Sequence, residues 1–260
     1  MHIDEIFIIP LLAGGIAILT FFSGFGLGTL LTPVLLVFFP TELAITLTGI
    51  VHLVNNIFKW LLVRNNINWL IVKRFGIPAI IASFVGAYLL FVFKEFNINY
   101  TYLLFGKPVN QSLLKIIISI MLITFATIEL IPKFKNLKFK TKWLPLGGVL
   151  SGFFGGLSGV QGALRTAFLI KTNLSKESFV ATAVTVSALV DFTRIGVYLS
   201  NTSFLETSKQ YYLLFLTCIG AIIGSLIGNF GLKKITINYL QKIVNICLII
   251  LAISLAIGII

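Results

Sequence analysis

The stretch GFGLGTLLTP, residues 24–33, interrupts the first hydrophobic segment of the chain, which runs from Ile6 to Phe39. Three of its ten residues are glycine, and the last one is proline. Glycine costs about 0.5–1 kcal/mol in a helix interior relative to alanine, and proline lacks a backbone donor. This composition predicts an elbow between two shorter helices.

A second glycine-rich stretch, GFFGGLSGVQG at residues 152–162, interrupts the hydrophobic segment Leu144–Ile170. The same helix-weakening composition predicts a second elbow here. We expect this break to extend across five glycines: Gly152, Gly155, Gly156, Gly159 and Gly162.

The two glycine-rich stretches occupy related places in the chain. A shift of 135 residues aligns four pairs: Gly24 with Gly159, Glu42 with Glu177, Asn56 with Asp191, and Lys59 with Arg194. Each pair alone is weak, but together they repeat the order of glycine elbow, acidic helix start and polar helix end. This order indicates an ancient duplication, and paired Gly-interrupted segments in two halves are typical of transport sites.

The composition of the 260-residue chain is that of a membrane protein. It is 58% hydrophobic and only 11% charged, with a mean hydropathy of +1.04. Soluble domains carry about 25% charged residues, so this chain has too little polar surface to cover a globule in water. Its apolar stretches of roughly 17 to 23 residues match a hydrocarbon core about 30 Å thick when helical.

The predicted fold class is an all-α integral membrane protein of about eight hydrophobic segments. The segments are Ile6–Phe39, Glu42–Val63, Gly76–Phe93, Ser112–Ile131, Leu144–Ile170, Glu177–Leu199, Tyr211–Phe230 and Tyr239–Ile260. We divide the chain into a first membrane repeat, residues 1–132, a basic cytoplasmic linker, residues 133–143, and a second membrane repeat, residues 144–260. The connection Lys94–Gln111 is too short to fold as a domain.

The distribution of basic residues favours broken segments that enter and leave the membrane on one side. If every segment crossed once, basic clusters would lie on both sides, against the positive-inside rule. With two re-entrant hairpins, one set becomes cytoplasmic: Arg64, Lys73, Arg74, Lys133, Lys135, Lys138, Lys140, Lys142, Lys171, Lys176, Lys233 and Lys234. The homologous halves would then be inverted repeats with Gly-broken re-entrant helices, whose elbows meet near the bilayer midplane. Broken segments that cross the membrane are the open alternative.

Several functional classes are not expected. The net charge of +12 would suggest nucleic acid in a soluble protein, but basic loops of membrane proteins report orientation. Cys218 and Cys247 lie in apolar runs without CxxC spacing, and we expect no cofactor and no metal. No hydrolase elbow, zinc-protease pair or Walker lysine is present, so we do not expect an enzyme. The acidic stretch Met1–Glu5 does not resemble the start of a signal peptide.

The two elbows predict an anion site. Non-helical backbone at membrane depth must face protein or a watery cavity, because lipid offers its amides no partners. Two half-helices that begin there can direct free N–H groups and positive dipole ends at one point. We expect Gly26, Gly28, Gly159 and Gly162, together with Gly24, to form the elbows and bind the substrate. A structural kink from close packing is the alternative.

Charged residues inside apolar segments add to this site. Arg165 follows the second elbow without a local partner, and we expect Arg165 and Gln161 to contact the anion. Asp191 and Arg194 stand three apart on one helix face and can partly neutralise each other. The alternative for Arg165 is a side chain that reaches the cytoplasmic interface.

The second segment carries its own polar stripe. We expect Asn56 and Lys59, with Asp191 and Arg194, to bind the substrate by lining or gating its path. Lys59 also has the interfacial alternative, because Trp60 follows it. His52 is a candidate proton relay, since imidazole titrates near neutral pH, and a hydrogen bond to a neighbour is the alternative.

A stripe of small residues, Gly220, Gly224 and Gly228, recurs every four residues in the seventh segment. On a helix these glycines share one face and admit a close neighbouring backbone. We expect that neighbour to be a helix of the same chain, and a dimer seam is the alternative.

The quoted residues resemble the signature of a known family. Residues 24–33 are similar to the glycine-rich, proline-ended pattern of the sulfite exporter TauE/SafE family, and their repetition about 135 residues later fits its two-repeat organisation. The resemblance covers essentially the whole chain. In the second half, Gln161 and Arg165 stand where the family pattern usually has glycine and apolar residues, and Phe168 stands where proline would repeat. These departures suit an anion.

The resemblance implies a multi-pass permease or exporter in the plasma (inner) membrane that moves small sulfur-containing anions such as sulfite or organosulfonates. The expected partners are that anion, the lipid bilayer and a coupling ion, either a proton or sodium; a homo-oligomer is also open. The alternative function is a non-transporting membrane scaffold or assembly subunit whose charges serve partner helices. Co-purification with a partner in fixed proportion, without anion binding, would favour that alternative.

Overall fold

The computed structural model describes residues 3–21, 26–95, 99–104, 106–131, 139–170, 172–201, 208–231 and 237–259. In chain order the elements are α1 (Ile3–Thr20), α2 (Leu27–Leu35), α3 (Thr41–Val63), the 3-10 turn η1 (Arg64–Asn66), α4 (Trp69–Ile71), the π-helical turn η2 (Val72–Gly76), α5 (Ile77–Glu95), β1 (Asn99–Leu104), β2 (Lys107–Ser112), α6 (Leu113–Leu130), the 3-10 turn η3 (Thr141–Trp143), α8 (Leu144–Ser158), α9 (Gly162–Leu169), α10 (Lys176–Asn201), α11 (Ser208–Gly231) and α12 (Ile237–Ala256).

The helices fit a membrane protein. Within the described residues, four helices are long and apolar enough to cross a bilayer: Thr41–Asn66, Trp69–Phe93, Glu177–Ser200 and Ser208–Phe230. Shorter apolar helices cover Glu5–Thr20, Leu113–Ile128 and Asn245–Ala256. Every hydrophobic segment predicted from the sequence contains helix, so the chain is a helical membrane protein.

The first hydrophobic segment consists of two helices that fold back on each other. α1 ends at Thr20, α2 begins at Leu27, and Gly26 between them has a φ of +83°, which favours glycine. Ile9 of α1 and Leu35 of α2 line the same small cavity, so the start of α1 lies near the end of α2. Gly24 lies outside the described residues.

The second broken segment folds back in the same way. Leu144 at the start of α8 and Phe168 near the end of α9 belong to one buried cluster. The ring of Phe139, which precedes α8 in the chain, stacks on the ring of Phe168 with 4.1 Å between their centroids.

The prediction of a wide break across the second glycine stretch is wrong. Helix α8 continues through Gly152, Gly155 and Gly156, and the break is confined to the three residues before Gly162. These glycines stay helical because α8 packs directly on α5: a Cβ atom at Gly152 would collide with the carbonyl of Ala79. The close backbone contact offsets the helix-weakening effect of glycine.

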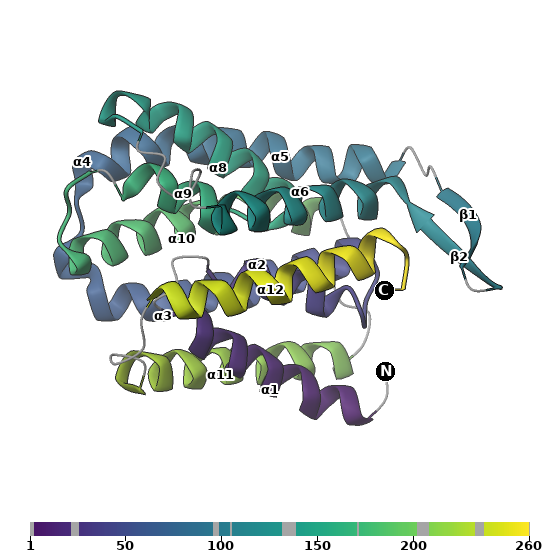
Figure 1. Ribbon diagram of the computed structural model, residues 1–260. Helices are drawn as coiled ribbons and strands as arrows, with labels where there is room; N and C mark the ends of the chain where they lie inside the picture. The colour runs from purple at the N-terminus through teal and green to yellow at the C-terminus, as the bar shows by residue number, and fades with distance from the viewer. Residues whose placement is uncertain are drawn as a thin grey trace.

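The packing joins the two halves of the chain. α8 of the second half packs along α5 of the first, and α1 of the first half packs along α11 of the second. α3 and α10 pack together between these two pairs (Figure 1). The glycine stripe of α11 faces α1, where Cβ atoms at Gly220 and Gly224 would collide with the carbonyls of Pro10 and Gly14. The prediction that this stripe packs within the chain is confirmed.

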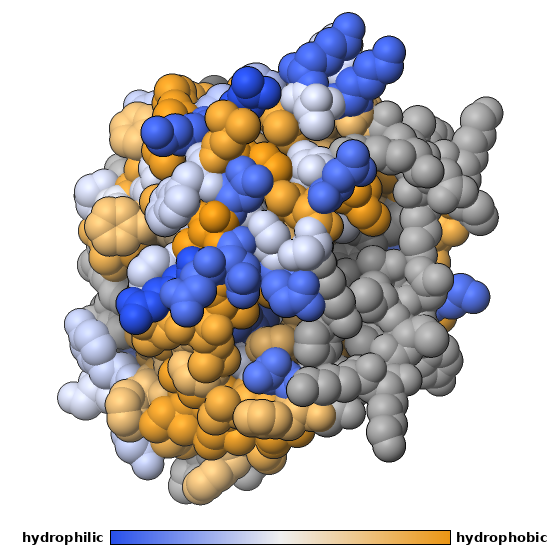
Figure 2. All heavy atoms as spheres, turned by 90° about the vertical axis from the view of Figure 1, so that its left-hand side faces the viewer, coloured by the Kyte–Doolittle hydropathy of each residue, from blue (hydrophilic) through white to orange (hydrophobic). Residues whose placement is uncertain are grey.

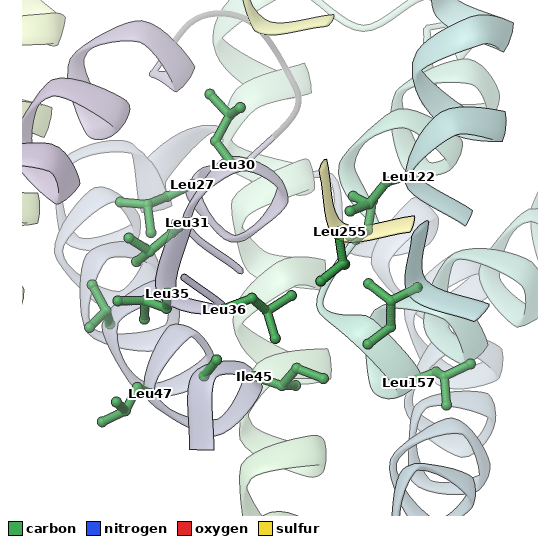
Figure 3. Close-up of a cluster of buried hydrophobic side chains, with 14 of the residues drawn as sticks. Leu27, Leu30, Leu31, Leu35, Leu36, Ile45, Leu47, Leu122, Leu157 and Leu255 are labelled. Atoms are coloured by element: carbon green, nitrogen blue, oxygen red, sulfur yellow. The ribbon is translucent and has the colours of Figure 1, made fainter. Parts of the chain in front are cut away.

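Helix α2 lies in the apolar core of the molecule. Leu27, Leu31 and Leu35 of α2 are buried, and they share one cluster with Leu157 of α8 and Leu255 of α12 (Figure 3). The first elbow is therefore held by apolar side chains from both halves.

A β-hairpin stands at one end of the helices, and the sequence reasoning did not predict it. β1 and β2 pair antiparallel, with Asn99 opposite Ser112, at the right of Figure 1. The Gln111 side chain donates to the carbonyls of Leu255 at 2.6 Å and Ala256 at 2.8 Å at the end of α12. The helical class holds, and one two-stranded sheet is added to it.

Hydrophilic side chains gather at the opposite end, which carries α4 (Figure 2). Exposed cations there include Arg64, Lys73, Arg74, Lys140 and Lys142. Of the other residues expected on that side, Lys133, Lys135, Lys138, Lys171, Lys233 and Lys234 lie outside the described residues, as does most of the predicted linker.

Candidate functional site

The polar residues of α3 and α10 meet inside the molecule. His52, Asn56 and Lys59 follow one another at spacings of four and three on α3, and all three are buried. Asp191 and Arg194 lie on α10 and are fully buried. Because α3 and α10 pack together, the two stripes face each other in the interior of the protein.

The carboxylate of Asp191 is the centre of this cluster. Its Oδ2 atom lies 2.7 Å from Nδ1 of His52 and accepts a hydrogen bond from Asn56 Nδ2 at 2.8 Å. Its Oδ1 atom lies 2.9 Å from both Nε and Nη2 of Arg194, and Nε2 of Gln161 is 3.5 Å away. The predicted neutralisation of Arg194 by Asp191 is present.

The second elbow positions Gln161 beside the carboxylate of Asp191. Gly159 caps α8 in the left-handed conformation with a φ of +81°, where a side chain would be strained. A Cβ atom at Gly159 would also lie 2.7 Å from Nη1 of Arg194. The hydroxyl of Ser151 donates to the Gln161 carbonyl at 3.2 Å and fixes the chain beyond the elbow.

Arg165 lies in the first turns of α9, and its side chain is only 5% exposed. Its Nη1 atom donates to the hydroxyl of Ser187 on α10. Its Nε atom has no hydrogen-bond partner in the part of the chain that the structure describes. The interfacial alternative for Arg165 does not fit this burial, and the local partner that the sequence did not reveal is Ser187.

The first elbow, from the other half of the chain, lies against His52 and Arg165. A Cβ atom at Gly26 would lie 3.0 Å from Nε2 of His52 and 3.9 Å from Nη2 of Arg165. Gly28 lies in the first turn of α2, where a Cβ atom would be 3.2 Å from the carbonyl oxygen of Gly159. The two elbows therefore meet at the polar cluster.

Lys59 is the third buried cation of the cluster. Its side chain is 6% exposed, and Nζ lies 4.8 Å from the centre of the Phe21 ring, a cation–π contact. Within the described residues Lys59 forms no ion pair. The interfacial alternative for Lys59 does not fit this burial either.

The charges of the cluster do not balance. Among the described residues, the buried charged side chains include Lys59, Arg165 and Arg194, and Asp191 is the one buried carboxylate. Among the described residues, one buried carboxylate therefore stands against three buried basic side chains, and Asp191 is already paired with Arg194. Burying such cations costs several kcal/mol, and a bound anion would lower that cost.

The structure brings the candidate residues together. Gly26, Gly28 and Gly159 lie beside seven polar side chains from α3, the second elbow, α9 and α10: His52, Asn56, Lys59, Gln161, Arg165, Asp191 and Arg194. Gly162 begins α9 one residue after Gln161. The sequence reasoning missed Ser187, although the 135-residue shift pairs it with His52 and could have identified it.

Comparisons with known proteins identify the family of the chain. The family model described as sulfite exporter TauE/SafE matches residues 7–255 of the chain, which includes both elbows and both polar stripes. No curated protein and no solved structure matches the chain. The chain therefore belongs to the sulfite exporter TauE/SafE family, a family of membrane transporters for sulfur-containing anions.

Proposed function

We propose that this protein is a permease or exporter of the plasma membrane that binds one small sulfur-containing anion, such as sulfite or an organosulfonate, beside Arg165. The observation that carries the proposal is the guanidinium of Arg165, which is buried between two broken helices with one donor unpaired among the described residues. Sulfite and sulfonate groups present several oxygen acceptors, which a guanidinium can bind by charge-assisted hydrogen bonds.

The elbows supply the rest of the binding site. The first N–H groups of a helix have no partner within the helix, so the starts of α2 and α9 carry partial positive charge. Both starts lie beside Arg165, at Gly26 and at Gln161. Glycine at position 26 leaves room for a ligand where a side chain would contact His52. Lys59 adds a second buried positive charge.

The fold supports alternating access between two inverted repeats. α1 and α8 begin at opposite ends of the molecule, and each returns to its own end through α2 or α9 (Figure 1). The exposed cations near α4 would face the cytoplasm by the positive-inside rule, and the β-hairpin would face the other side. The site would then lie near the bilayer midplane, where each half can open it in turn.

Transport by purified protein in proteoliposomes tests this proposal. We expect sulfite, thiosulfate or a small sulfonate to stabilise the folded protein against heat and to exchange across the vesicle membrane. Arg165→Ala should lower the exchange at least about tenfold, because a hydrogen bond to a charged group contributes about 1.5–3 kcal/mol. Insertion should persist, as judged by size-exclusion chromatography.

The matched control is Arg64→Ala, which removes an exposed arginine at the basic end. That variant should exchange the anion at the wild-type rate. Normal exchange by Arg165→Ala would remove Arg165 from the site. Wild-type protein that binds none of the anions yet co-purifies with another membrane protein would support the scaffold alternative.

A further inference from the structure

His52 connects the buried carboxylate with the place assigned to the anion. Its Nδ1 atom lies 2.7 Å from Asp191 Oδ2, so this side of the ring is committed to the carboxylate. Its Nε2 atom faces Gly26, at 3.0 Å from the position of a Cβ atom there, and Arg165 Nη2 lies 3.9 Å from the same position. Nε2 and the Arg165 guanidinium therefore border one small space.

Asn56 lies against the imidazole of His52, but its strongest hydrogen bond goes to Asp191 and not to Nε2. Its Nδ2 atom is 3.3 Å from Nδ1 and 3.4 Å from Nε2 of His52, whereas its bond to Asp191 Oδ2 is 2.8 Å long. The shorter bond to a carboxylate is the stronger one. With a proton on Nδ1 donated to Asp191, the lone pair of Nε2 stays directed at the elbow.

The charges around His52 make its protonation depend on the anion. Asp191 and Arg194 face it from α10, and Arg165 faces it from α9. Lys59 lies on the same helix, while the first turn of α2 presents glycine backbone. A second proton on the imidazole would put a cation beside Arg165. An anion between them removes that repulsion, so proton and anion favour each other's binding.

On the basis of the proposed function, we propose that the protein moves its anion together with a proton, in the same direction, and that Nε2 of His52 carries that proton. A hydronium ion gives its proton to the Nε2 lone pair and leaves as water, which makes the imidazole a cation. Asp191 stays a carboxylate throughout and holds the ring through Nδ1. On release, the Nε2–H bond breaks, water takes the proton, and the anion leaves with it.

The test uses the full-length protein in vesicles that contain a pH-sensitive dye, with the membrane potential clamped at zero by potassium and valinomycin. The first probes are methanesulfonate and thiosulfate, which stay fully ionised near neutral pH and carry no proton themselves. A pH gradient of one unit should drive about tenfold accumulation of methanesulfonate, because one unit equals 1.36 kcal/mol per proton. The lumen should acidify as either anion enters down its own gradient.

Sulfite is run beside these probes, because it carries a proton of its own near neutral pH. His52→Asn supplies the reference for that background. In this variant labelled anion should still exchange at equal pH, at a lowered but measurable rate, whereas a pH gradient should no longer drive accumulation of methanesulfonate. Asn55→Ala is the matched control, because Asn55 binds Ser225 of α11 at 2.6 Å on another side of α3 and should leave pH-driven accumulation intact.

The outcomes separate this inference from the proposed function. If wild-type protein exchanges no anion at all, the proposed function fails. If it exchanges anion but a pH gradient drives no accumulation, the proton coupling is wrong and the anion site stands. A folded His52→Asn variant that accumulates anion as the wild type does, or that loses exchange as well, would overturn the role of Nε2. The wild-type measurement decides the coupling even if that variant does not fold.

Discussion

The two broken helices share one architecture but carry different chemistry. α2 begins at Leu27 and α9 begins at Gly162, 135 residues later, and each lies beside a half-helix that packs on the opposite half of the chain. Yet the first elbow has Gly26 and Leu30 where the second has Gln161 and Arg165. The first elbow therefore provides space and apolar support, while the second provides charge. In the proposed function, the repeated scaffold thus supports a single, one-sided anion site.

The helices after the elbows differ in the same way. The 135-residue shift pairs His52 with Ser187 and Asn56 with Asp191, and the members of the second pair bind each other directly. Residues that contact their own repeat counterpart lie close to the axis that relates the two halves. This contact supports the proposal of inverted repeats and puts the cluster where both halves meet.

Of the substitutions considered, we expect the largest loss of stability within the pair Asn56 and Asp191. Asp191→Ala removes the carboxylate that holds Arg194 and leaves that guanidinium buried without its partner. Breaking a buried ion pair costs about 3–5 kcal/mol, so the unfolding temperature in detergent should fall steeply. Asn56→Ala, at the equivalent place on α3, removes a hydrogen bond to the same carboxylate and should cost only about 1–3 kcal/mol.

Thermal unfolding of both variants, beside the wild type, measures this difference. A control at an exposed acidic residue, Glu95→Ala, should unfold with the wild type. Equal losses for Asp191→Ala and Asn56→Ala would mean that the two halves contribute alike and that the charge network is not the stabilising feature.

The sequence was sufficient for the helices because lipid constrains them strongly. The predicted segment Glu42–Val63 and the observed helix Thr41–Val63 differ by one residue, since a membrane helix must be apolar and long enough to satisfy its own backbone. Arg165 and Asp191 could be proposed as site residues because charge inside an apolar segment is expensive. Their mutual distances came only from the structure.

The features that sequence reasoning missed depend on contacts between distant segments. Gly152 and Gly156 weaken a helix on their own, and only the backbone of α5 opposite them explains why α8 continues. The hydroxyl of Ser187 is ordinary in a helix until Arg165 is placed beside it. The short hairpin of β1 and β2 has too few residues to give a clear strand pattern.

Two helix contacts join the halves, α5 with α8 and α1 with α11. Overpacking either contact should destabilise the protein to a similar extent, which is the next largest expected effect. A Cβ atom at Gly152 would collide with the Ala79 carbonyl on α5, and one at Gly224 with the Gly14 carbonyl on α1. Each glycine-to-alanine change should destabilise the protein by about 1–3 kcal/mol through overpacking. Gly196→Ala is the control, because its Cβ atom would meet nothing within 4 Å, and it should cost nothing or stabilise slightly.

Unfolding temperatures of the three variants test this equivalence. A loss at Gly152 without a loss at Gly224 would show that only the α5–α8 seam is tight. The two halves would then differ in how tightly their helices pack as well as in their polar residues.

The smallest effect is expected at Ser187, which positions Arg165 by accepting its Nη1–H. Ser187→Ala keeps the buried charge but frees the guanidinium, so the KM for anion exchange should rise about two- to tenfold, the equivalent of one hydrogen bond, with little change in kcat. Ser187→Thr retains the hydroxyl and should restore the KM. A merely structural role would instead lower the unfolding temperature and the amount of active protein. Thr29→Val is the control, because it removes a hydroxyl beside Leu30, where the first half has no arginine. This variant should leave the KM unchanged. An equal rise in its KM would contradict a one-sided site.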